Sequence, residues 1–335
     1  CILWQPTGET KMGHGGIVIL CILCLVASAG AQLRMNYYNQ SCPQAEAIVK
    51  DFIQKHIPNA PSLAAPLLRM QFHDCFVRGC DGSVLLDTTP TNGNQTEKLG
   101  TPNVSLRGFD FIDRLKSLLE NACRGIVSCA DIIALAARDA ISVTGGPSWA
   151  VPTGRFDGRV SINTEATSQI PAPTANFSTL QTLFGNVGLN LSDLVILSGA
   201  HTVGLSHCSS FSRRLYNFTG AGDQDPAMDS EYADNLRRLR CRSAADNTTR
   251  VEMDPGSRGT FDLSYYRLVL RRRGLFQSDA ALRTNGTTLG FINQLLRGTT
   301  GDFFAAFSGA MEKMGRIGIK TAANGEIRRQ CRRVN

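Results

Sequence analysis

An arginine and a histidine four residues apart, Arg69 and His73, suggest the first chemistry. On a helix this spacing places both side chains on one face, one turn from each other. The imidazole can move a proton near neutral pH, while the guanidinium stays charged and can stabilise developing negative charge. Phe72 lies between them in sequence and would keep a pocket narrow and apolar. A lone histidine on an amphipathic helix is usually a packing residue, but the arginine partner favours a site for a polarised oxygen substrate.

The residues after His73 form a loop rich in possible oxygen ligands. Six or so oxygens from one tight loop suit calcium, although the spacing is not that of an EF-hand. Cys75 and Cys80 are close enough to bridge the loop. An ordinary capped turn closed by a disulfide explains the same spacing, so both interpretations stay open. The candidate ligands are the side chains of Asp74, Asp81 and Ser83 and the backbone carbonyls of Val77 and Gly79.

A second histidine, His201, follows an apolar segment that ends in Gly199 and Ala200. Such small residues would let a flat cofactor approach the backbone, and His201 could then be an axial ligand of haem iron. A core histidine is the alternative. A ligating histidine needs an acceptor for its other ring nitrogen, and Asp279 is a candidate whose proximity the spacing alone cannot prove.

The elements that must position these residues are mostly helices. Strand-like alternation is scarce, Pro- or Gly-rich loops interrupt the pattern at 89–103, 145–154 and 171–175, and no long polar linker divides the chain. The sequence therefore predicts one mainly α-helical domain over residues 32–335. Apolar residues at helical spacing predict helices over 45–56, 62–76, 109–122, 129–143, 179–186, 191–197, 202–215, 230–241 and 263–273.

The first 31 residues have a different pattern. An apolar run over 17–27 precedes Ala29 and Ala31 in the positions of a signal-peptide cleavage site. We expect translation to start at Met12, residues 1–11 to be upstream sequence, and the mature chain to begin at Gln32 with no further membrane segment. A retained signal anchor is the minor alternative, because the run is short for a membrane span.

Cysteines and glycosylation motifs agree with export. Eight cysteines remain after residue 31, an even number that favours disulfides over a cytosolic metal site, although composition leaves their pairing open. Eight N-x-[ST] motifs occur, more than chance readily supplies, and most are expected in glycosylated surface loops. They begin at Asn39, Asn94, Asn103, Asn176, Asn190, Asn217, Asn247 and Asn285.

The formal net charge is +7, and it survives removal of residues 1–31 because Glu9 and Lys11 cancel. A basic exported protein could be held by acidic wall polysaccharide. The arginine clusters at 237–242, 271–273 and 328–333 lack a nucleic-acid-binding motif and interleaved aromatic residues. We interpret them as solvated helix faces, and nucleic acid is not an expected partner.

Two stretches carry a family resemblance: RxxFHDCFVxGCDGSVLL from Arg69 and DLVxLSGAHTxG from Asp193. With Cys42, Cys123, Cys129 and Cys331, they resemble the class III (plant secretory) haem peroxidases over essentially all of 32–335. The resemblance implies an all-α peroxidase fold with haem b (iron protoporphyrin IX) between a distal and a proximal helical half, stapled by disulfides. Arg69, Phe72 and His73 then match the distal peroxide pocket, and His201 matches the proximal iron ligand with Asp279 behind it.

The same resemblance assigns further residues. Asn103 would hydrogen-bond the distal histidine, with Glu97 linked to it, so the Asn103 motif is expected to be unglycosylated. Pro171 matches the residue beside which aromatic donors bind, and Trp149 the family's usual single tryptophan. Two calcium ions are implied: one on Asp74, Val77, Gly79, Asp81 and Ser83, the other on Thr202, Asp254, Ser257, Thr260 and Asp262. The implied disulfides are Cys42–Cys123, Cys75–Cys80, Cys129–Cys331 and Cys208–Cys241.

Departures from the family pattern are small. Gln71 stands where histidine is frequent, and Phe156 where arginine is usual. The chain ends four residues after Cys331, without the extension of vacuolar members, which favours the cell wall or extracellular space. The expected function is peroxide-dependent one-electron oxidation of phenolic donors by a secreted monomer.

Two other classes of function compete with this interpretation. A catalytically impaired, basic wall-binding glycoprotein on the same fold should have lost Arg69, His73 or His201, and all three are present. A secreted hydrolase would need a pair of carboxylates, and none stands out.

Overall fold

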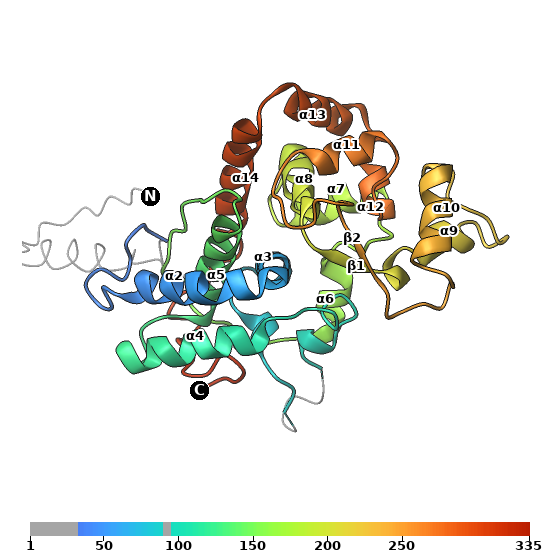
Figure 1. Cartoon of the computed structure of the whole chain (residues 1–335). Helices are drawn as coiled ribbons and strands as arrows, with labels where there is room; N and C mark the ends of the chain where they lie inside the picture. The colour runs from blue at the N-terminus through green and yellow to red at the C-terminus, as the bar shows by residue number, and fades with distance from the viewer. Residues whose placement is uncertain (1–32, 90–94) are drawn as a thin grey trace, which may run out of the picture.

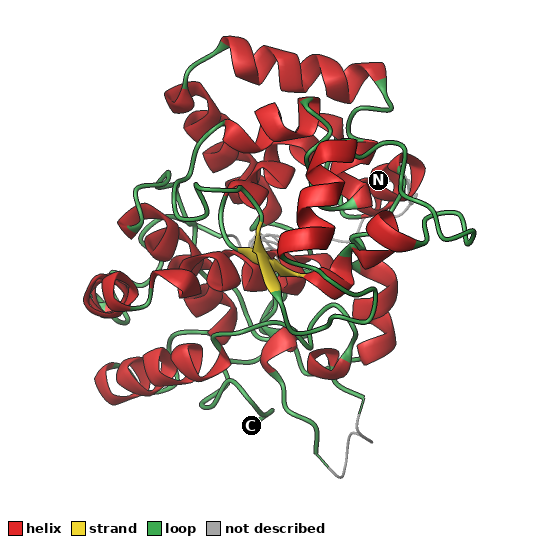
Figure 2. Ribbon diagram, turned by 45° about the vertical axis from the view of Figure 1, so that its right-hand side comes forward, coloured by secondary structure: helices red, strands yellow, loops and turns green. Residues whose placement is uncertain are grey.

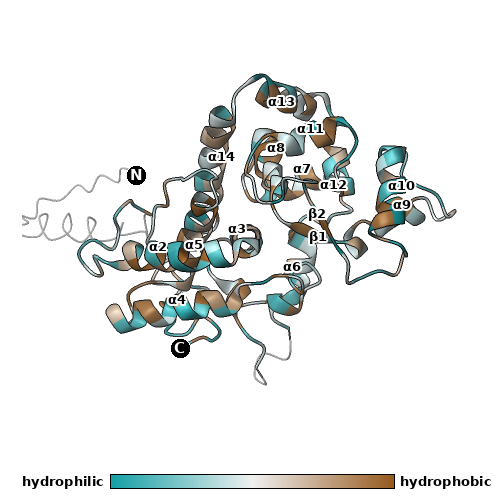
Figure 3. Ribbon diagram, in the orientation of Figure 1, coloured by the Kyte–Doolittle hydropathy of each residue, from teal (hydrophilic) through white to brown (hydrophobic). Residues whose placement is uncertain are grey.

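The computed structural model describes residues 33–89 and 95–335 (Figure 1). The expected signal segment with Met12, the mature start at Gln32 and the motif at Asn94 lie outside these residues. The prediction of a mainly α-helical fold is confirmed: helices dominate, and two short strands are the sheet of the described chain (Figure 2). Hydrophobic and hydrophilic residues alternate around the helices, as they must where one face is buried (Figure 3).

The helices of the distal half are α2 (Ala45–His56), α3 (Ala64–Phe76), α4 (Phe109–Ala122), α5 (Cys129–Val143) and α6 (Asn163–Gln169). The helices that follow are α7 (Phe177–Asn186), α8 (Leu191–Ser198), α9 (Ser212–Tyr216), α10 (Ser230–Leu239), α11 (Ser264–Leu270), α12 (Gln277–Ala281), α13 (Gly286–Arg297) and α14 (Thr300–Met314). Strands β1 (Leu205–His207) and β2 (Arg250–Glu252) pair antiparallel, with Ser206 opposite Val251. Short 3-10 helices cover Ile57–Asn59, Pro61–Leu63, Ser83–Leu85, Glu97–Leu99, Gly199–Thr202 and Cys208–Ser210.

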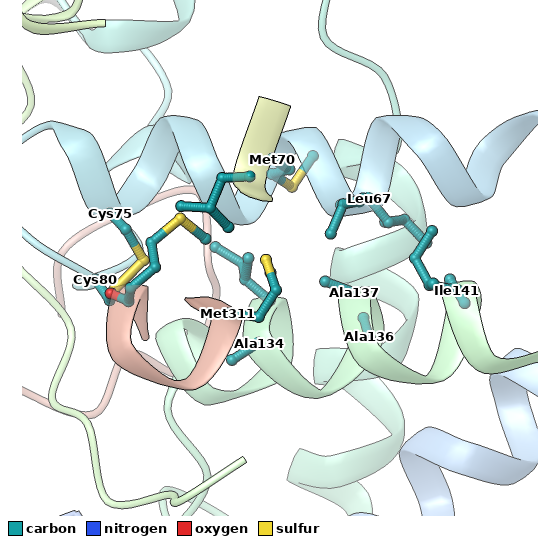
Figure 4. Packing of buried hydrophobic residues seen from close by; sticks show 14 of the residues in the cluster. Leu67, Met70, Cys75, Cys80, Ala134, Ala136, Ala137, Ile141 and Met311 are labelled. Atoms are coloured by element: carbon teal, nitrogen blue, oxygen red, sulfur yellow. A yellow bond between two sulfur atoms is a disulfide. The ribbon is translucent and has the colours of Figure 1, made fainter. Parts of the chain in front are cut away.

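Helix α5 is the centre of the distal half, and both α2 and α3 pack along it. It begins at Ser128, whose side chain accepts a hydrogen bond from the Asp131 backbone N–H as an N-cap. Figure 4 shows Leu67 and Met70 of α3 in the same buried cluster as the small residues Ala134 and Ala137 of the neighbouring helix α5. Because alanine lets helices approach closely, α3 is held firmly, and with it the face that carries Arg69 and His73.

The other half of the molecule is built around α8, which contacts α7, α13 and α14. The chain leaves α8 directly into the 3-10 helix Gly199–Thr202, which contains His201 and contacts α11. A separate small core holds α9 and α10 together through Phe211, Leu215 and Leu236. His201 therefore sits at a junction of elements from distant parts of the sequence.

The expected helix over 202–215 is wrong. Gly204 has a φ of +98°, which a helix does not accommodate, and an added Cβ there would lie 2.9 Å from the Cβ of Ala65. The chain instead enters β1 and then turns into α9. Several helices that the periodicity did not indicate are also present, among them α6, α12, α13 and α14.

Within residues 33–89 and 95–335, no single helix has the length and apolar character to cross a membrane. The pair Phe177–Asn186 and Leu191–Thr202, bent by 106°, passes that test by length and composition alone.

Candidate active site

Arg69 is held by the loop that follows the 3-10 helix Glu97–Leu99. Its guanidinium donates to Ser105 Oγ at 3.0 Å and to the Pro102 carbonyl at 2.7 Å. Although the side chain is solvent-accessible, the surrounding protein desolvates it enough to lower its pKa to about 10. The group still remains cationic at neutral pH, so it can stabilise negative charge beside His73.

His73 is buried, and its Nδ1 lies 2.5 Å from Oδ1 of the buried Asn103. The Asn103 amide N–H₂ in turn donates to the Glu97 backbone carbonyl at 2.8 Å, which fixes the orientation of the amide. Because an amide oxygen only accepts hydrogen bonds, His73 Nδ1 carries the proton and Nε2 is left with a free lone pair. Burial, and secondarily the charge of Arg69, lower the His73 pKa well below its usual value, against the opposing effect of Asn103. His73 is therefore neutral near pH 7, and its Nε2 can accept a proton.

Phe72 forms an aromatic wall next to His73. Its ring centroid lies 5.9 Å from the His73 ring, 4.1 Å from Phe76 and 6.2 Å from Phe184. Phe184 belongs to α7, so this contact connects the helix of the distal histidine with the other half of the molecule. The two departures lie elsewhere: Gln71 is buried, and Phe156 is half-buried and paired through its backbone with Lys320.

His201 is bound to a buried carboxylate. Its Nδ1 lies 2.8 Å from Oδ1 of Asp279, although the two residues are 78 positions apart. Burial would raise the Asp279 pKa, but attraction to His201 and hydrogen bonds from His201, the Phe276 N–H and the Tyr265 hydroxyl outweigh it and lower the pKa. The ionised carboxylate holds the proton on His201 Nδ1, and no described residue hydrogen-bonds Nε2. The His201 side chain is 35% exposed, so Nε2 is accessible to a ligand.

Residues 74–83 form the distal oxygen loop. Buried oxygens without a hydrogen-bond partner in the described structure gather in and beside it: Asp74 Oδ1, Asp81 Oδ2, Ser83 Oγ and both carboxylate oxygens of Glu97, of which Asp81 Oδ2 has an ion-pair contact with Lys320. Burial raises the pKa of Asp74, and the Asp81 charge raises it further. Burial also raises the pKa of Glu97, and the negative charge of Asp74 raises it further. Buried oxygens without donors are the environment that a cation would stabilise.

A second group of oxygens surrounds Thr202, the residue after His201. Its Oγ lies 3.3 Å from Asp254 Oδ2, 3.3 Å from the Thr260 carbonyl and 3.4 Å from Asp262 Oδ1. One hydroxyl proton cannot satisfy three acceptors, so this group also suits a cation. Ser257 lies in the same loop, with its N–H bonded to the Asp254 carbonyl. Where the chain is described, no three His, Cys, Asp or Glu side chains form a metal cluster, so both groups depend on hydroxyl and carbonyl oxygens.

The C-terminal segment closes over the distal oxygen loop. Lys320 Nζ donates to the Arg78 carbonyl at 2.8 Å and lies 3.5 Å from Asp81 Oδ2. The fully buried Arg328 donates to the Gly82 carbonyl at 2.6 Å and to the Cys331 carbonyl at 2.7 Å. The loop is thus fixed by residues more than 200 positions further along the chain.

The four disulfides of the structure join the pairs that the resemblance implied: Cys42–Cys123, Cys75–Cys80, Cys129–Cys331 and Cys208–Cys241. Cys75–Cys80 closes the distal oxygen loop, and Cys129–Cys331 ties the C-terminal segment to the start of α5. Trp149 is buried, with its ring 6.1 Å from that of Phe307.

The remaining predicted residues are placed as follows. Pro171 lies half-buried between α6 and α7, and no hydrogen bond of the described chain links it to Arg69, His73 or His201. Asn103 is 1% exposed, unlike Asn39, Asn176, Asn190, Asn217 and Asn247, which are exposed, and Asn285, which is intermediate.

Sequence reasoning missed several residues of the site. Ser105 and Pro102 hold Arg69, Phe184 packs against Phe72, and Tyr265 donates to Asp279 Oδ1 at 2.9 Å. None of them has a motif or a spacing that marks it. They could be found only from the tertiary structure.

A helical fold with an arginine–histidine pair on one helix and a carboxylate-bound histidine in the opposite half is the arrangement of a peroxidase. A family model described as Peroxidase matches residues 49–297. The chain is 64% identical to Peroxidase 39 of Arabidopsis thaliana, over 97% of this chain and all of that relative. It is 64% identical to Peroxidase 3 of the same plant, over 93% of this chain and 94% of the relative. Peroxidase 1 of Oryza sativa subsp. japonica is 53% identical, over 95% and 98% of the two chains.

The chain therefore belongs to the peroxidase family, as a class III plant secretory peroxidase. It is an enzyme that acts on hydrogen peroxide and a donor substrate.

Proposed function

We propose that the protein binds haem b between its distal and proximal halves, with His201 as the axial ligand, and oxidises phenolic donors outside the cell. The observation that carries the proposal is that two histidines, His73 and His201, have the same hydrogen-bonding pattern. Each has its Nδ1 hydrogen-bonded to a fixed oxygen acceptor, His73 to Asn103 and His201 to Asp279. Each therefore presents the Nε2 lone pair, one as a base and one as a ligand.

The residues around His201 fit an iron porphyrin. Asp279 supplies the acceptor that a ligating histidine needs, and the rings of Tyr265 and Phe276 pack edge-on to the His201 ring, with their centroids 5.6 and 5.2 Å from its own. Haem, when bound, supplies the electrons that reduce peroxide and the oxidising equivalents for the donor. The negative charge behind His201 makes the imidazole a stronger electron donor to a ligated metal.

The distal residues handle the proton and the charge. His73 Nε2 would take a proton from one oxygen of peroxide and return it to the other oxygen, which leaves as water. Arg69 stabilises the negative charge that develops on the departing oxygen. Asn103 raises the basicity of His73 and fixes its tautomer, because it accepts the Nδ1 proton.

The two oxygen groups support two calcium sites. Asp74, Asp81 and Ser83, with the carbonyls of Val77 and Gly79, would hold the first ion. Thr202, Asp254, Ser257, Thr260 and Asp262 would hold the second. Each ion would neutralise charge beside a histidine, because Asp74 follows His73 and Thr202 follows His201.

The setting of the reaction is also part of the proposal. A mature monomer from Gln32 would be secreted to the cell wall or extracellular space, with phenolic donors reaching the site near Pro171. The net charge of +7 favours retention by acidic wall polysaccharide. The buried position of Asn103 supports its being unglycosylated, because a glycan cannot be attached to an enclosed side chain.

The test is the absorption spectrum of the mature protein, loaded with haem and calcium, before and after one equivalent of peroxide. A Soret band that shifts promptly and returns on adding guaiacol is the expected result. The His73→Leu variant should keep the band but react roughly 10²–10⁴-fold more slowly, whereas His56→Leu, on α2, should react like wild type. Folded protein without a Soret band would refute haem binding. A normal rate in His73→Leu would refute the role of His73.

A further inference from the structure

The carboxylate behind His201 does not serve His201 alone. Asp279 Oδ1 accepts hydrogen bonds from both His201 Nδ1, at 2.8 Å, and the Tyr265 hydroxyl, at 2.9 Å. Asp279 Oδ2 accepts the backbone N–H of Phe276 at 2.8 Å. Because all these groups are donors, each withdraws electron density from one buried carboxylate.

Tyr265 is enclosed by the surrounding protein, which holds its ring in place. It lies on α11, is 1% exposed, and packs its ring edge-on to His201 and to Tyr266 at 5.6 and 5.2 Å. The neighbouring Tyr266 is equally buried, but its hydroxyl donates to the Val195 carbonyl at 3.0 Å and not to Asp279. The two tyrosines thus differ in whether the hydroxyl donates to Asp279, the carboxylate that accepts the hydrogen bond of His201.

We propose that Tyr265 is a positioning residue that limits how much negative charge Asp279 passes to His201. Two donors compete for the electron density of Oδ1, so the His201–Asp279 hydrogen bond is weaker than it would be with one donor. A weaker bond leaves less imidazolate character on His201, and a bound iron is then easier to reduce. This inference rests on the proposed haem ligation by His201.

The magnitude follows from the strength of one hydrogen bond to a charged acceptor. Removing such a bond changes an equilibrium by about tenfold or more when its whole effect is expressed. Only the difference between the ferric and ferrous states appears in the potential, so the expected shift is a part of this effect, on the order of tenfold, which is about 59 mV for one electron.

The experiment compares the Tyr265→Phe and Tyr266→Phe holoenzymes with wild type. The readouts are the ferric/ferrous potential and the iron–histidine stretching frequency of the ferrous protein, neither of which measures activity. Tyr265→Phe is expected to shift the potential negative and the stretching frequency upward, and Tyr266→Phe to leave both within error of wild type. Equal shifts in the two variants, or no shift in Tyr265→Phe, would overturn the inference.

A second perturbation covers the case in which Tyr265→Phe fails to fold. Incorporation of 3-fluorotyrosine at position 265 alone keeps the side-chain shape and makes the hydroxyl a stronger donor, so both readouts should move in the opposite direction. A shift in the same direction as Tyr265→Phe, or none, would contradict the inference. Absence of an iron–histidine band in the wild type would instead contradict the ligation by His201, which separates the two failures.

Discussion

The contact between His73 and Asn103 gives the sharpest test of the distal site. Asn103→Leu keeps roughly the same volume but removes the acceptor of His73 Nδ1 and the donor to the Glu97 carbonyl. The proton on His73 is then no longer confined to Nδ1, and the imidazole is a weaker base because Asn103 is the group that raises its pKa. We expect the Asn103→Leu variant to fold and bind haem but to react with peroxide more slowly than the wild type.

The structure sets the size of both effects. Loss of a hydrogen bond that stabilises the imidazolium as it forms costs about 1.5–3 kcal/mol, which corresponds to a roughly 10–100-fold lower rate constant. Two buried groups left without partners each cost about 1–3 kcal/mol, so the free energy of unfolding should fall by about 2–6 kcal/mol. The expected loss of rate is smaller than that of His73→Leu, because the base itself is still present.

The assay is stopped-flow measurement of the Soret shift at increasing peroxide concentration, with proteins produced without glycans. Asn285→Ala is the matched control. Asn285 caps α13 through hydrogen bonds from the Thr287 and Thr288 N–H groups, so its loss should cost about 1 kcal/mol of stability and leave the peroxide rate unchanged. A wild-type rate constant in Asn103→Leu would refute the assignment of Asn103 as the residue that activates His73.

Three further outcomes follow from the same contacts. Since the His73 pKa lies well below 6.5, the peroxide rate should stay constant from neutral into mildly acidic pH and fall only below that pKa; a midpoint near 6.5 by stopped flow would contradict this. Removal of calcium should lower the melting temperature more at pH 8 than at pH 5, because a carboxylic acid with a raised folded-state pKa, such as Asp74 or Asp254, contributes stability that is lost as the pH rises. An equal loss at both pH values would contradict calcium binding by these buried carboxylates. Arg328→Ala should lower the free energy of unfolding by about 3–5 kcal/mol in a denaturant titration, because it leaves the buried Asp157 without its ion pair. Substitution of the exposed Arg329 by alanine should cost little, and similar costs for the two variants would show that the buried ion pair of Arg328 is unimportant.

The sequence predicted the parts of the site that depend on local spacing. Arg69 and His73 share a face because they lie on one regular helix, and α2, α4 and α5 have the expected bounds. Helices α13 and α14 were not predicted, although the sequence contains signals for where they begin. Asn285 and Thr299 are their N-caps, and Thr299 forms a capping box with Asp302. The expected helix over 202–215 was wrong because apolar periodicity does not register the positive φ of Gly204.

Contacts between distant residues could not be predicted from spacing. His201 and Asp279 are 78 positions apart, and Tyr265 reaches the same carboxylate from a third element. The link between Glu97 and Asn103, which the resemblance implied, runs through the Glu97 backbone carbonyl, while the Glu97 carboxylate lies buried near Asp74. Every residue type has a backbone carbonyl, so a contact of this kind cannot be predicted from which residue stands at the position.

The distal oxygen loop shows why the whole chain is needed for one site. Gly79 has a φ of +92°, and an added Cβ there would lie 2.5 Å from the Cα of Gly318, so the two backbone segments can meet only where neither has a side chain. The Cys80 N–H donates to the Ile317 carbonyl at 3.0 Å, and Arg328 completes the contact. Because Asp74 directly follows His73, displacement of the C-terminal segment would be transmitted to His73, the proposed base. Substitutions at Gly318 can therefore impair the peroxide step without altering any residue that touches the substrate.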